Sequence, residues 1–396
     1  MASTSATETQ RAPAGELRGG TVFLAFAAFG LLWGLYAAAI PEIKRDTGAS
    51  DGALGAALVC VALAAAPAVF TTGRLLDRCG RPVAVAAVCA FAVVAALPTL
   101  VGSVPWLVIT LLLFGFGSGA CDVVINSLAA TVEAETGTKV LNRAHALFSV
   151  GMLVGAVVTS VIRASGGSAS WPMIGLGAAT VLGAVALRGR VPARIARAAK
   201  DDDRPSGRWR INPVVLALGG LAALAMLVES GVQQWSAVYL ENEVAAPPGV
   251  SGLAPGVFAG AMALGRLGGH WLSTRASDRV VLAASGLLSG GGVIVVAVAH
   301  HPLVALLGLG VAGAAISVGA PTVYSVAGQL AAPERRGAVI GATASIGYIG
   351  LLLGPAVVGQ LASVTELRTA IGALAVVSLA VSLAGLRVPT REDDQA

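Results

Sequence analysis

Two acidic residues stand in long apolar stretches of the chain, where a charge is expensive. All but two of the 21 acidic residues are expected in loops, tails or helix ends, and the exceptions are Asp122 and Glu229. An ionised side chain at the centre of a bilayer costs about 2.5 to 3.5 kcal/mol or more, so an acid that persists there is a candidate for function. The alternative is that each acid stays neutral and only hydrogen-bonds between helices.

Each of these acids is followed by an amide four residues later, Asn126 after Asp122 and Gln233 after Glu229. On a helix this spacing puts both side chains on one face, and a polar stripe of this kind faces other helices or water rather than lipid. A carboxyl group whose surroundings alternate between dry and wet can take up and release a proton, so both acids are predicted to carry protons. Counted from the midpoints of their segments, they lie about 6 Å and about 4 to 5 Å on opposite sides of the membrane centre, which excludes a single dyad.

His145 is predicted four residues into an apolar helix, on the cytoplasmic side. From there it could reach Asp122 across a helical hairpin and relay protons, because imidazole titrates near neutral pH. A lone histidine can equally be a structural group.

Aromatic and amide side chains in the apolar stretches could hold a substrate. The candidates are Trp33, Tyr36, Asn126, Gln233, Gln234, Trp235 and Tyr324. They suit a polar, largely uncharged molecule such as a sugar, or an amphipathic metabolite, while Trp235 could instead belong to an interfacial belt. No Lys or Arg is expected in the membrane interior, so strongly anionic substrates are disfavoured.

The elements that position these residues follow from composition. The 396 residues are 56% hydrophobic and only 12% charged, with a mean hydropathy of +0.81, which excludes an ordinary soluble domain. A bilayer core about 30 Å thick needs roughly 20 apolar residues per helix, and the chain supplies twelve such segments. Their predicted ranges are 20–41, 52–73, 82–101, 105–131, 141–163, 170–188, 212–240, 250–273, 279–300, 302–329, 337–362 and 366–388. Most of the 51 glycines lie inside them, where small residues let helices approach closely.

The basic residues predict the orientation. With both termini in the cytoplasm, all but four of the 26 Lys and Arg residues lie on the cytoplasmic side, as the positive-inside rule requires. The four exceptions are Lys44, Arg45, Arg163 and Arg368. The basic pI of about 9.3 then reflects membrane anchoring and gives no reason to expect a nucleic-acid partner.

The chain divides into two halves. A polar segment at 189–211 separates a bundle at 20–188 from a second at 212–388, with cytoplasmic tails at 1–19 and 389–396. The sequence Gly-Arg-Leu recurs at 73–75 and at 265–267, at matching places in the two halves, which indicates an internal repeat. The aspartates at 201–203 are expected to be part of a solvated linker rather than a metal site.

The stretch 73–82, GRLLDRCGRP, resembles the loop motif between helices 2 and 3 of the major facilitator superfamily, with Pro82 in place of a basic residue. In that family the loop contacts the opposite half at the cytoplasmic gate. The resemblance therefore implies a gating role for Gly73, Arg74, Asp77, Arg78, Gly80 and Arg81, with the two glycines allowing a tight turn and Asp77 holding one of the arginines. Arg266 belongs to the second copy, which has Gly269 in the place of the acid.

Four further stretches, at 115–133, 144–156, 229–240 and 346–359, are similar to the YbjJ-type bacterial permeases, distant relatives of the proton-coupled fucose permeases. This resemblance implies an all-α fold of twelve transmembrane helices in two pseudo-symmetric bundles, with helices 1, 4, 7 and 10 around a central cavity. It implies a monomeric secondary transporter of a small organic solute in the bacterial inner membrane, without a cofactor or metal.

Other functions remain open on the sequence alone. A proton-antiporting exporter often has Gly-Pro in helix 5, whereas this chain has it only at 354–355 in helix 11. A membrane enzyme would need a catalytic cluster, but the sequence has no HExxH motif and no paired intramembrane aspartates. A passive channel would show flux without saturation or dependence on a proton gradient.

Overall fold

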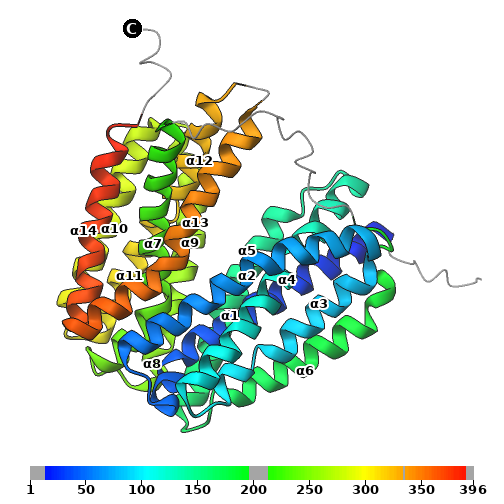
Figure 1. The fold of residues 1–396 in the computed structure, drawn as a ribbon, viewed down its shortest axis with the longest axis horizontal. Helices are drawn as coiled ribbons and strands as arrows, with labels where there is room; N and C mark the ends of the chain where they lie inside the picture. Colours follow the sequence, from blue (N-terminus) through cyan, green and yellow to red (C-terminus); the bar gives the residue numbers. More distant parts are fainter. Residues whose placement is uncertain (1–13, 196–212, 333–334, 389–396) are drawn as a thin grey trace, which may run out of the picture.

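The computed structural model describes residues 14–195, 213–332 and 335–388, without the side chains of 14–18, 270, 271 and 273. All regular secondary structure in these ranges is helical (Figure 1). The first half contains α1 (Ala14–Thr47), α2 (Asp51–Cys79), α3 (Arg81–Val94), η1 (Leu97–Thr99), α4 (Val104–Thr136), α5 (Leu141–Ala164), α6 (Ser170–Ala186) and η2 (Arg188–Arg190). The second contains α7 (Pro213–Asn242), α8 (Pro248–Ser251), α9 (Leu253–Ser273), α10 (Asp278–Val298), α11 (Pro302–Ile316), α12 (Gly319–Leu330), α13 (Arg336–Val364) and α14 (Leu367–Gly385).

Eleven spans in the described residues are long and apolar enough to cross a membrane, and α6 is a shorter apolar helix of 17 residues. These helices form two bundles, α1–α6 and α7–α14 (Figure 1). In the first bundle α1 packs along α5 and α2 along α4; in the second, α7 packs along α13 and α9 along α11. The two bundles thus repeat one pattern of helix pairing, as an internal repeat requires, and the predicted all-α fold of paired bundles is confirmed.

Glycines bring the paired helices into backbone contact. A Cβ added at Gly30 or Gly34 of α1 would overlap the backbone of Phe148 or Met152 of α5. In the second bundle, a Cβ added at Gly350 of α13 would overlap the backbone of α7 in the same way. Membrane helices associate through such close packing because lipid provides no hydrophobic drive between them.

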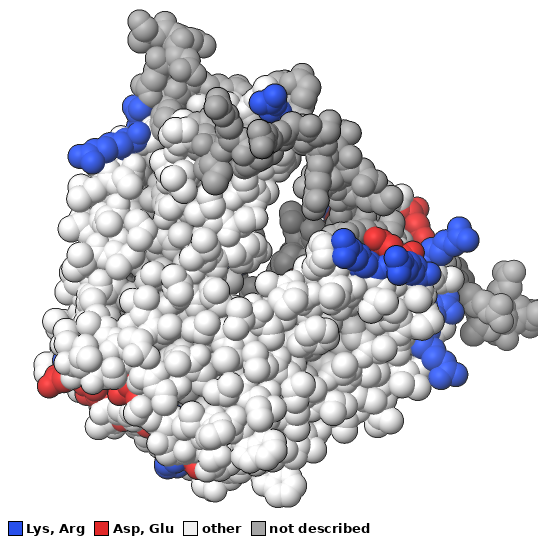
Figure 2. Space-filling view, in the orientation of Figure 1, with Lys and Arg blue, Asp and Glu red and all other residues white. Residues whose placement is uncertain are grey.

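The bundles touch mainly at one end of the molecule, where α2 meets α13 and α5 meets α8 and α9. We call this the far end, and the opposite end, where α6 finishes and α7 begins, the linker end. At the far end Gly55 and Gly359 approach so closely that a Cβ on either would lie 2.7–2.8 Å from the other's Cα. Towards the linker end the bundles diverge, and the space-filling view is hollowed between them (Figure 2). We call this hollow the central opening.

Several predicted boundaries change. Helix α1 begins at Ala14, six residues before the predicted start, and runs to Thr47. Helix α2 continues to Cys79, because nothing in its last turns breaks a helix before Gly80. The predicted 82–101 segment is α3 followed by the short turn η1. The predicted linker falls largely on 196–212, outside the described residues, as do the aspartates at 201–203, most of the N-terminal tail and the tail from 389.

The predicted segment 302–329 is two helices, α11 and α12, interrupted between Ile316 and Gly319. At the interruption Ser317 Oγ donates to the Ala314 carbonyl at 2.8 Å, and Ser285 Oγ of α10 donates to the Ala315 carbonyl at 2.7 Å. A side-chain hydroxyl that donates to a helix carbonyl competes with the backbone N–H that would otherwise donate to it. This competition explains the break between α11 and α12.

Candidate functional site

Asp122 lies in the middle of α4, a helix that packs against α1 and α2. Asn126 Nδ2 donates to Asp122 Oδ1 at 3.1 Å and to the Asp122 carbonyl at 2.9 Å, so the predicted i, i+4 pair forms one hydrogen-bonded unit. Across from α4, Tyr348 of α13 is 59% exposed, and its hydroxyl lies within electrostatic reach of Asp122. An aromatic side chain of the other bundle is therefore near enough to interact electrostatically with the acid.

Glu229 lies near the middle of α7 and forms an ion pair with Arg266 of α9, with 3.8 Å between Oε1 and the guanidinium. The two side chains are 23% and 52% exposed. The prediction that the membrane interior lacks Lys and Arg is wrong at Arg266, which lies within the apolar span Pro248–Gly269. The reason is geometric: helical side chains lean towards the helix N-terminus, so Arg266 reaches away from the linker end towards mid-depth.

His145 does not join Asp122. Its ring packs edge-on against Phe26 of α1, with centroids 5.0 Å apart, and the charge of Arg266 reaches it from α9. Within the described residues no hydrogen bond or ion pair connects His145 to Asp122. The predicted contact between His145 and Asp122 is not made in this conformation, because α5 packs along α1 and makes only slight contact with α4.

Three substrate candidates with partly exposed side chains hold polar contacts. Trp33 Nε1 donates to Ser118 Oγ at 3.0 Å, and Gln233 Nε2 donates to the Pro255 carbonyl at 3.2 Å. Tyr324 points its hydroxyl at Met226 Sδ, 3.4 Å away, and this hydroxyl lies within electrostatic reach of Tyr348 and Glu229. Gln234 and Asn126 are also only partly buried.

Tyr36 and Trp235 have no exposed surface. Tyr36 packs against Trp33 and Phe114, with ring centroids 5.8 and 4.5 Å away. Trp235 Nε1 donates to the Pro355 carbonyl of α13 at 2.9 Å. In this conformation neither ring borders the central opening, and Trp235 does not lie at the surface as a belt residue would.

The loop motif packs on its own bundle. Gly80 has φ 60°, and a Cβ there would overlap the carbonyl of Ala193, so this glycine alone makes the turn. Gly73 lies buried within α2, which corrects its predicted place in the turn. Arg81 Nε donates to the Val191 carbonyl at 2.7 Å, and Arg74 lies 3.9 Å over the ring of Phe70.

Asp77 and Arg78 are exposed. Asp77 forms no ion pair or hydrogen bond with another residue in the described ranges, so the predicted contact with a motif arginine is not made. The motif lies at the linker end, where the bundles are apart in this conformation.

A buried cluster of charges closes the far end. Arg163 of α5 is 2% exposed and forms ion pairs with Glu241 of α7 at 2.7 Å and Glu42 of α1 at 3.5 Å. Glu42 also accepts hydrogen bonds from Ser168 Oγ and from the backbone N–H of Ala169, at the start of α6. We call Glu42, Arg163 and Glu241 the far-end cluster; it joins the first bundle to the second.

Sequence analysis missed the role of this cluster, because its members were assigned to loops and helix ends. One signal was available in the sequence. Arg163 is one of the four basic residues predicted on the side of the membrane opposite the cytoplasm, where basic residues are rare. Tyr348 was not predicted as a site residue, because the sequence predicts the helix that carries it but not the direction in which its side chain points. Among the described residues no group of three or more His, Cys, Asp or Glu side chains is placed to hold a metal ion.

Two similar bundles that meet at one end around an opening with polar groups at mid-depth define a membrane transporter. A sequence profile of the Major Facilitator Superfamily matches residues 22–276 and 218–396. The chain belongs to that superfamily, and it is a secondary transporter, not an enzyme. An uncharacterized MFS-type transporter of Yersinia pestis is 31% identical over 376 residues, which cover 93% of this chain and 94% of that protein.

Solved structures share the fold at low sequence identity. A bacterial homolog of the human lysosomal transporter Spinster, in an inward-facing and unoccupied conformation, superposes with a TM-score of 0.76 at 15% identity, covering 96% of this chain and 97% of that one. The nucleoside transporter NupG superposes with a TM-score of 0.75 at 14% identity, covering 94% and 98%. At these identities the similarity concerns the fold alone.

Proposed function

We propose that this protein moves a small polar or amphipathic organic solute across the bacterial inner membrane by alternating access, coupled to protons. The linker end faces the cytoplasm, so the conformation described is inward-facing. Lys and Arg gather at that end of the first bundle, whereas acidic side chains predominate at the far end of the second (Figure 2). The charge bias supports this orientation, and the inward-facing Spinster homolog is similar in fold.

The ion pair between Glu229 and Arg266 is the observation that carries the proposal. Glu229 lies near the middle of α7, and the distance of 3.8 Å between its carboxylate and the Arg266 guanidinium is longer than a direct hydrogen bond. A proton bound to Glu229 would remove the charge that compensates Arg266. Arg266 would then be free to hold a solute oxygen. Proton uptake and solute binding are thereby linked through one side chain.

This pair changes the expected substrate class. The argument against anionic solutes rested on an absence of Arg from the membrane interior, and Arg266 removes it. A guanidinium recognises carboxylates and phosphates through paired N–H donors. The solute class therefore includes molecules with one anionic group, along with the neutral polar molecules that Trp33 and Tyr324 suit. The finer similarity to YbjJ-type permeases stays a prediction.

The test begins with a thermal-shift panel of sugars, amino acids, organic acids and nucleosides, since a ligand that binds the folded state raises its melting temperature. Hits are then measured for uptake and efflux in proteoliposomes under an imposed pH gradient. Asp122→Asn and Glu229→Gln should each make transport independent of the gradient. Glu366→Gln, which changes an exposed acid outside the opening, is the control.

Unchanged rates on collapse of the gradient, or gradient-driven transport in both variants, would reject proton coupling through these acids. The direction of movement distinguishes the alternatives. Accumulation inside vesicles with an acidic exterior indicates uptake with protons, and expulsion under the same gradient indicates an exporter.

A further inference from the structure

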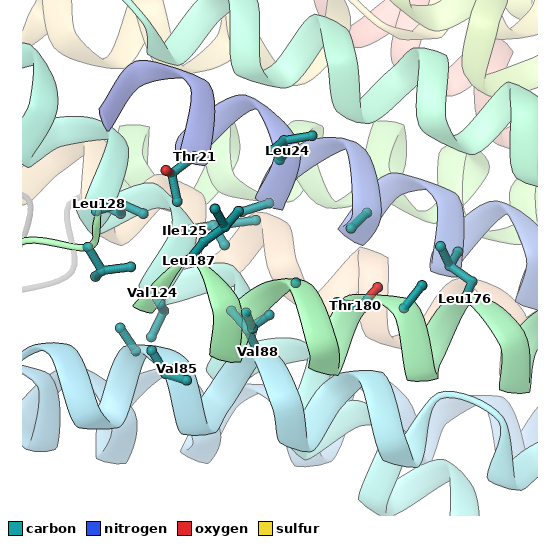
Figure 3. A pocket seen from close by; sticks show the side chains of 17 residues that line it. Thr21, Leu24, Val85, Val88, Val124, Ile125, Leu128, Leu176, Thr180 and Leu187 are labelled. Atoms are coloured by element: carbon teal, nitrogen blue, oxygen red, sulfur yellow. The ribbon is translucent and has the colours of Figure 1, made fainter. Parts of the chain in front are cut away.

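The first bundle contains an apolar pocket separate from the central opening. Its volume is about 270 Å³, and side chains of α1, α3, α4 and α6 converge on it (Figure 3). The lining is aliphatic, with only two polar side chains, Thr21 and Thr180, and no aromatic ring. For comparison, an apolar cavity of about 150 Å³ stays free of water and binds benzene. A pocket of this size and chemistry suits hydrocarbon.

The small side chains of the wall leave room for a hydrocarbon group between the helices. They come from three helices: Ala25, Ala28, Ala84, Ala179, Gly183 and Ala184. Leu24, another wall residue, is 59% exposed, so the pocket opens at the surface of the bundle. In a transmembrane bundle that surface faces the lipid tails.

Charge lies at one mouth of the pocket. Leu187 and Val191, which line it at the linker end, flank the exposed residues Arg188 and Arg190 of η2. Basic residues beside a gap between transmembrane helices attract anionic headgroups. A phospholipid whose phosphate lies at these arginines would place an acyl chain along the aliphatic walls of the pocket.

We propose that the pocket binds one acyl chain of an anionic phospholipid whose phosphate is held by Arg188 and Arg190. The bound lipid acts on transport through α4. Val124, Ile125 and Leu128 line the pocket from that helix, and the same helix presents Asp122 and Asn126 between the bundles. The lipid thus supports the helix that carries one proposed proton carrier.

The glycines of α6 provide a matched test. A Cβ at Gly183, in the pocket wall, or at Gly175, which is exposed and outside the lining, meets nothing within 4 Å. Leucine at either position therefore fits, but only Gly183→Leu fills the pocket. The full chain is purified in detergent, stripped of lipid and titrated with dioleoyl phosphatidylglycerol or dioleoyl phosphatidylcholine, and bound lipids are counted by native mass spectrometry.

The protein should bind one phosphatidylglycerol at least tenfold more tightly than phosphatidylcholine. Gly183→Leu should weaken that site tenfold or more, and Gly175→Leu should leave it unchanged. The double variant Arg188→Gln/Arg190→Gln should bind both lipids alike. The proposal is overturned if Gly183→Leu binds phosphatidylglycerol as tightly as the unaltered protein, or if both glycine variants lose binding equally. It is also overturned if inorganic phosphate alone binds the protein as tightly as phosphatidylglycerol does.

A second measurement needs no variant. Phosphatidylglycerol with a photoreactive diazirine in its acyl chain should crosslink to peptides that contain the pocket walls of α1 and α6. Crosslinks confined to other peptides overturn the proposal. Neither readout requires transport, so a failure here is distinct from a failure of the proposed proton coupling.

Discussion

The guanidinium of Arg163 on α5 lies 2.7 Å from the carboxylate of Glu241 on α7, and this ion pair joins the two bundles at the far end. Arg163 is 2% exposed, and its Nη1 also donates to the Ala38 carbonyl and to Ser251 Oγ, at 3.3 and 3.4 Å. Buried pairs of this kind are costly to break one partner at a time. The contacts with Glu241 and Ser251, which belong to the second bundle, can exist only while the far end is closed, so they stabilise the conformation that is open at the linker end.

Arg163→Gln should therefore shift the protein towards conformations open at the far end. A change of about 1 to 3 kcal/mol in this equilibrium alters the populations about 5- to 150-fold. Spin labels at Gly102 and Thr365, near the far ends of the two bundles, report the distance by double electron–electron resonance. The four native cysteines, all of which are free thiols, are first replaced so that only the two introduced positions are labelled. A longer-distance population should appear in the variant.

Arg368→Gln is the matched control. Arg368 lies at the same end and pairs with Glu243 at 3.7 Å, but both residues belong to the second bundle. Its loss should leave the label distance unchanged. Equal distance distributions for Arg163→Gln and the unaltered protein would mean that the far-end cluster does not hold the bundles together.

Asp122→Asn should abolish dependence on the pH gradient while the protein stays folded. The asparagine keeps an oxygen that can accept from Asn126 Nδ2, as Asp122 Oδ1 does at 3.1 Å, but it cannot bind a proton at working pH. Solute-driven exchange without a gradient, measured in proteoliposomes, should therefore survive. If both exchange and gradient-driven transport disappear in a stable variant, Asp122 contacts the solute rather than the proton.

The sequence predicts the apolar helices well because their length and composition follow directly from bilayer thickness. It also predicts the pair Asp122 and Asn126, because spacing along one helix determines which side chains share a face. Contacts between helices cannot be predicted in the same way, because they depend on the rotation of each helix about its axis and on which helices are neighbours. Arg266 and His145 show this. Each was placed on the correct helix, but the partner of Arg266, Glu229 of α7, was not predicted, and His145 packs against Phe26 of α1 instead of reaching Asp122 of α4.

Gly34→Ala should destabilise the first bundle. The added Cβ would overlap the backbone of Met152 on α5, and overpacking of this kind costs about 1 to 3 kcal/mol. The melting temperature in detergent should fall. Gly20→Ala, on the same helix with nothing within 4 Å of the added Cβ, should not lower it. Equal melting temperatures in the two variants would show that α1 and α5 can separate at no cost.

Trp33→Phe and Trp235→Phe each remove an indole N–H that donates a hydrogen bond, to Ser118 Oγ and to the Pro355 carbonyl respectively. Trp235 is completely buried, so its replacement removes a buried hydrogen bond and leaves a cavity, and it should cost about 1 to 3 kcal/mol of stability with little change in KM. Trp33 is partly exposed and is a candidate for solute binding, so its replacement should raise KM for the solute. Melting curves and transport kinetics on both variants check the contrast. A raised KM for Trp235→Phe alone would place that ring at the solute in another conformation.

The pair of Glu229 and Arg266 should matter far more for coupling than for stability. With 3.8 Å between the charges and Arg266 52% exposed, solvent screens the attraction, and such pairs contribute about 0.2 to 1 kcal/mol. A double-mutant cycle with Glu229→Gln and Arg266→Gln, followed by chemical unfolding, should therefore give a coupling energy in that range. Gradient-driven transport should nevertheless be lost in each single variant, while Arg266→Lys, which keeps the charge, should retain part of it. A coupling energy of several kcal/mol with transport unaffected would make the pair a structural link between α7 and α9, and proton coupling would then require another group.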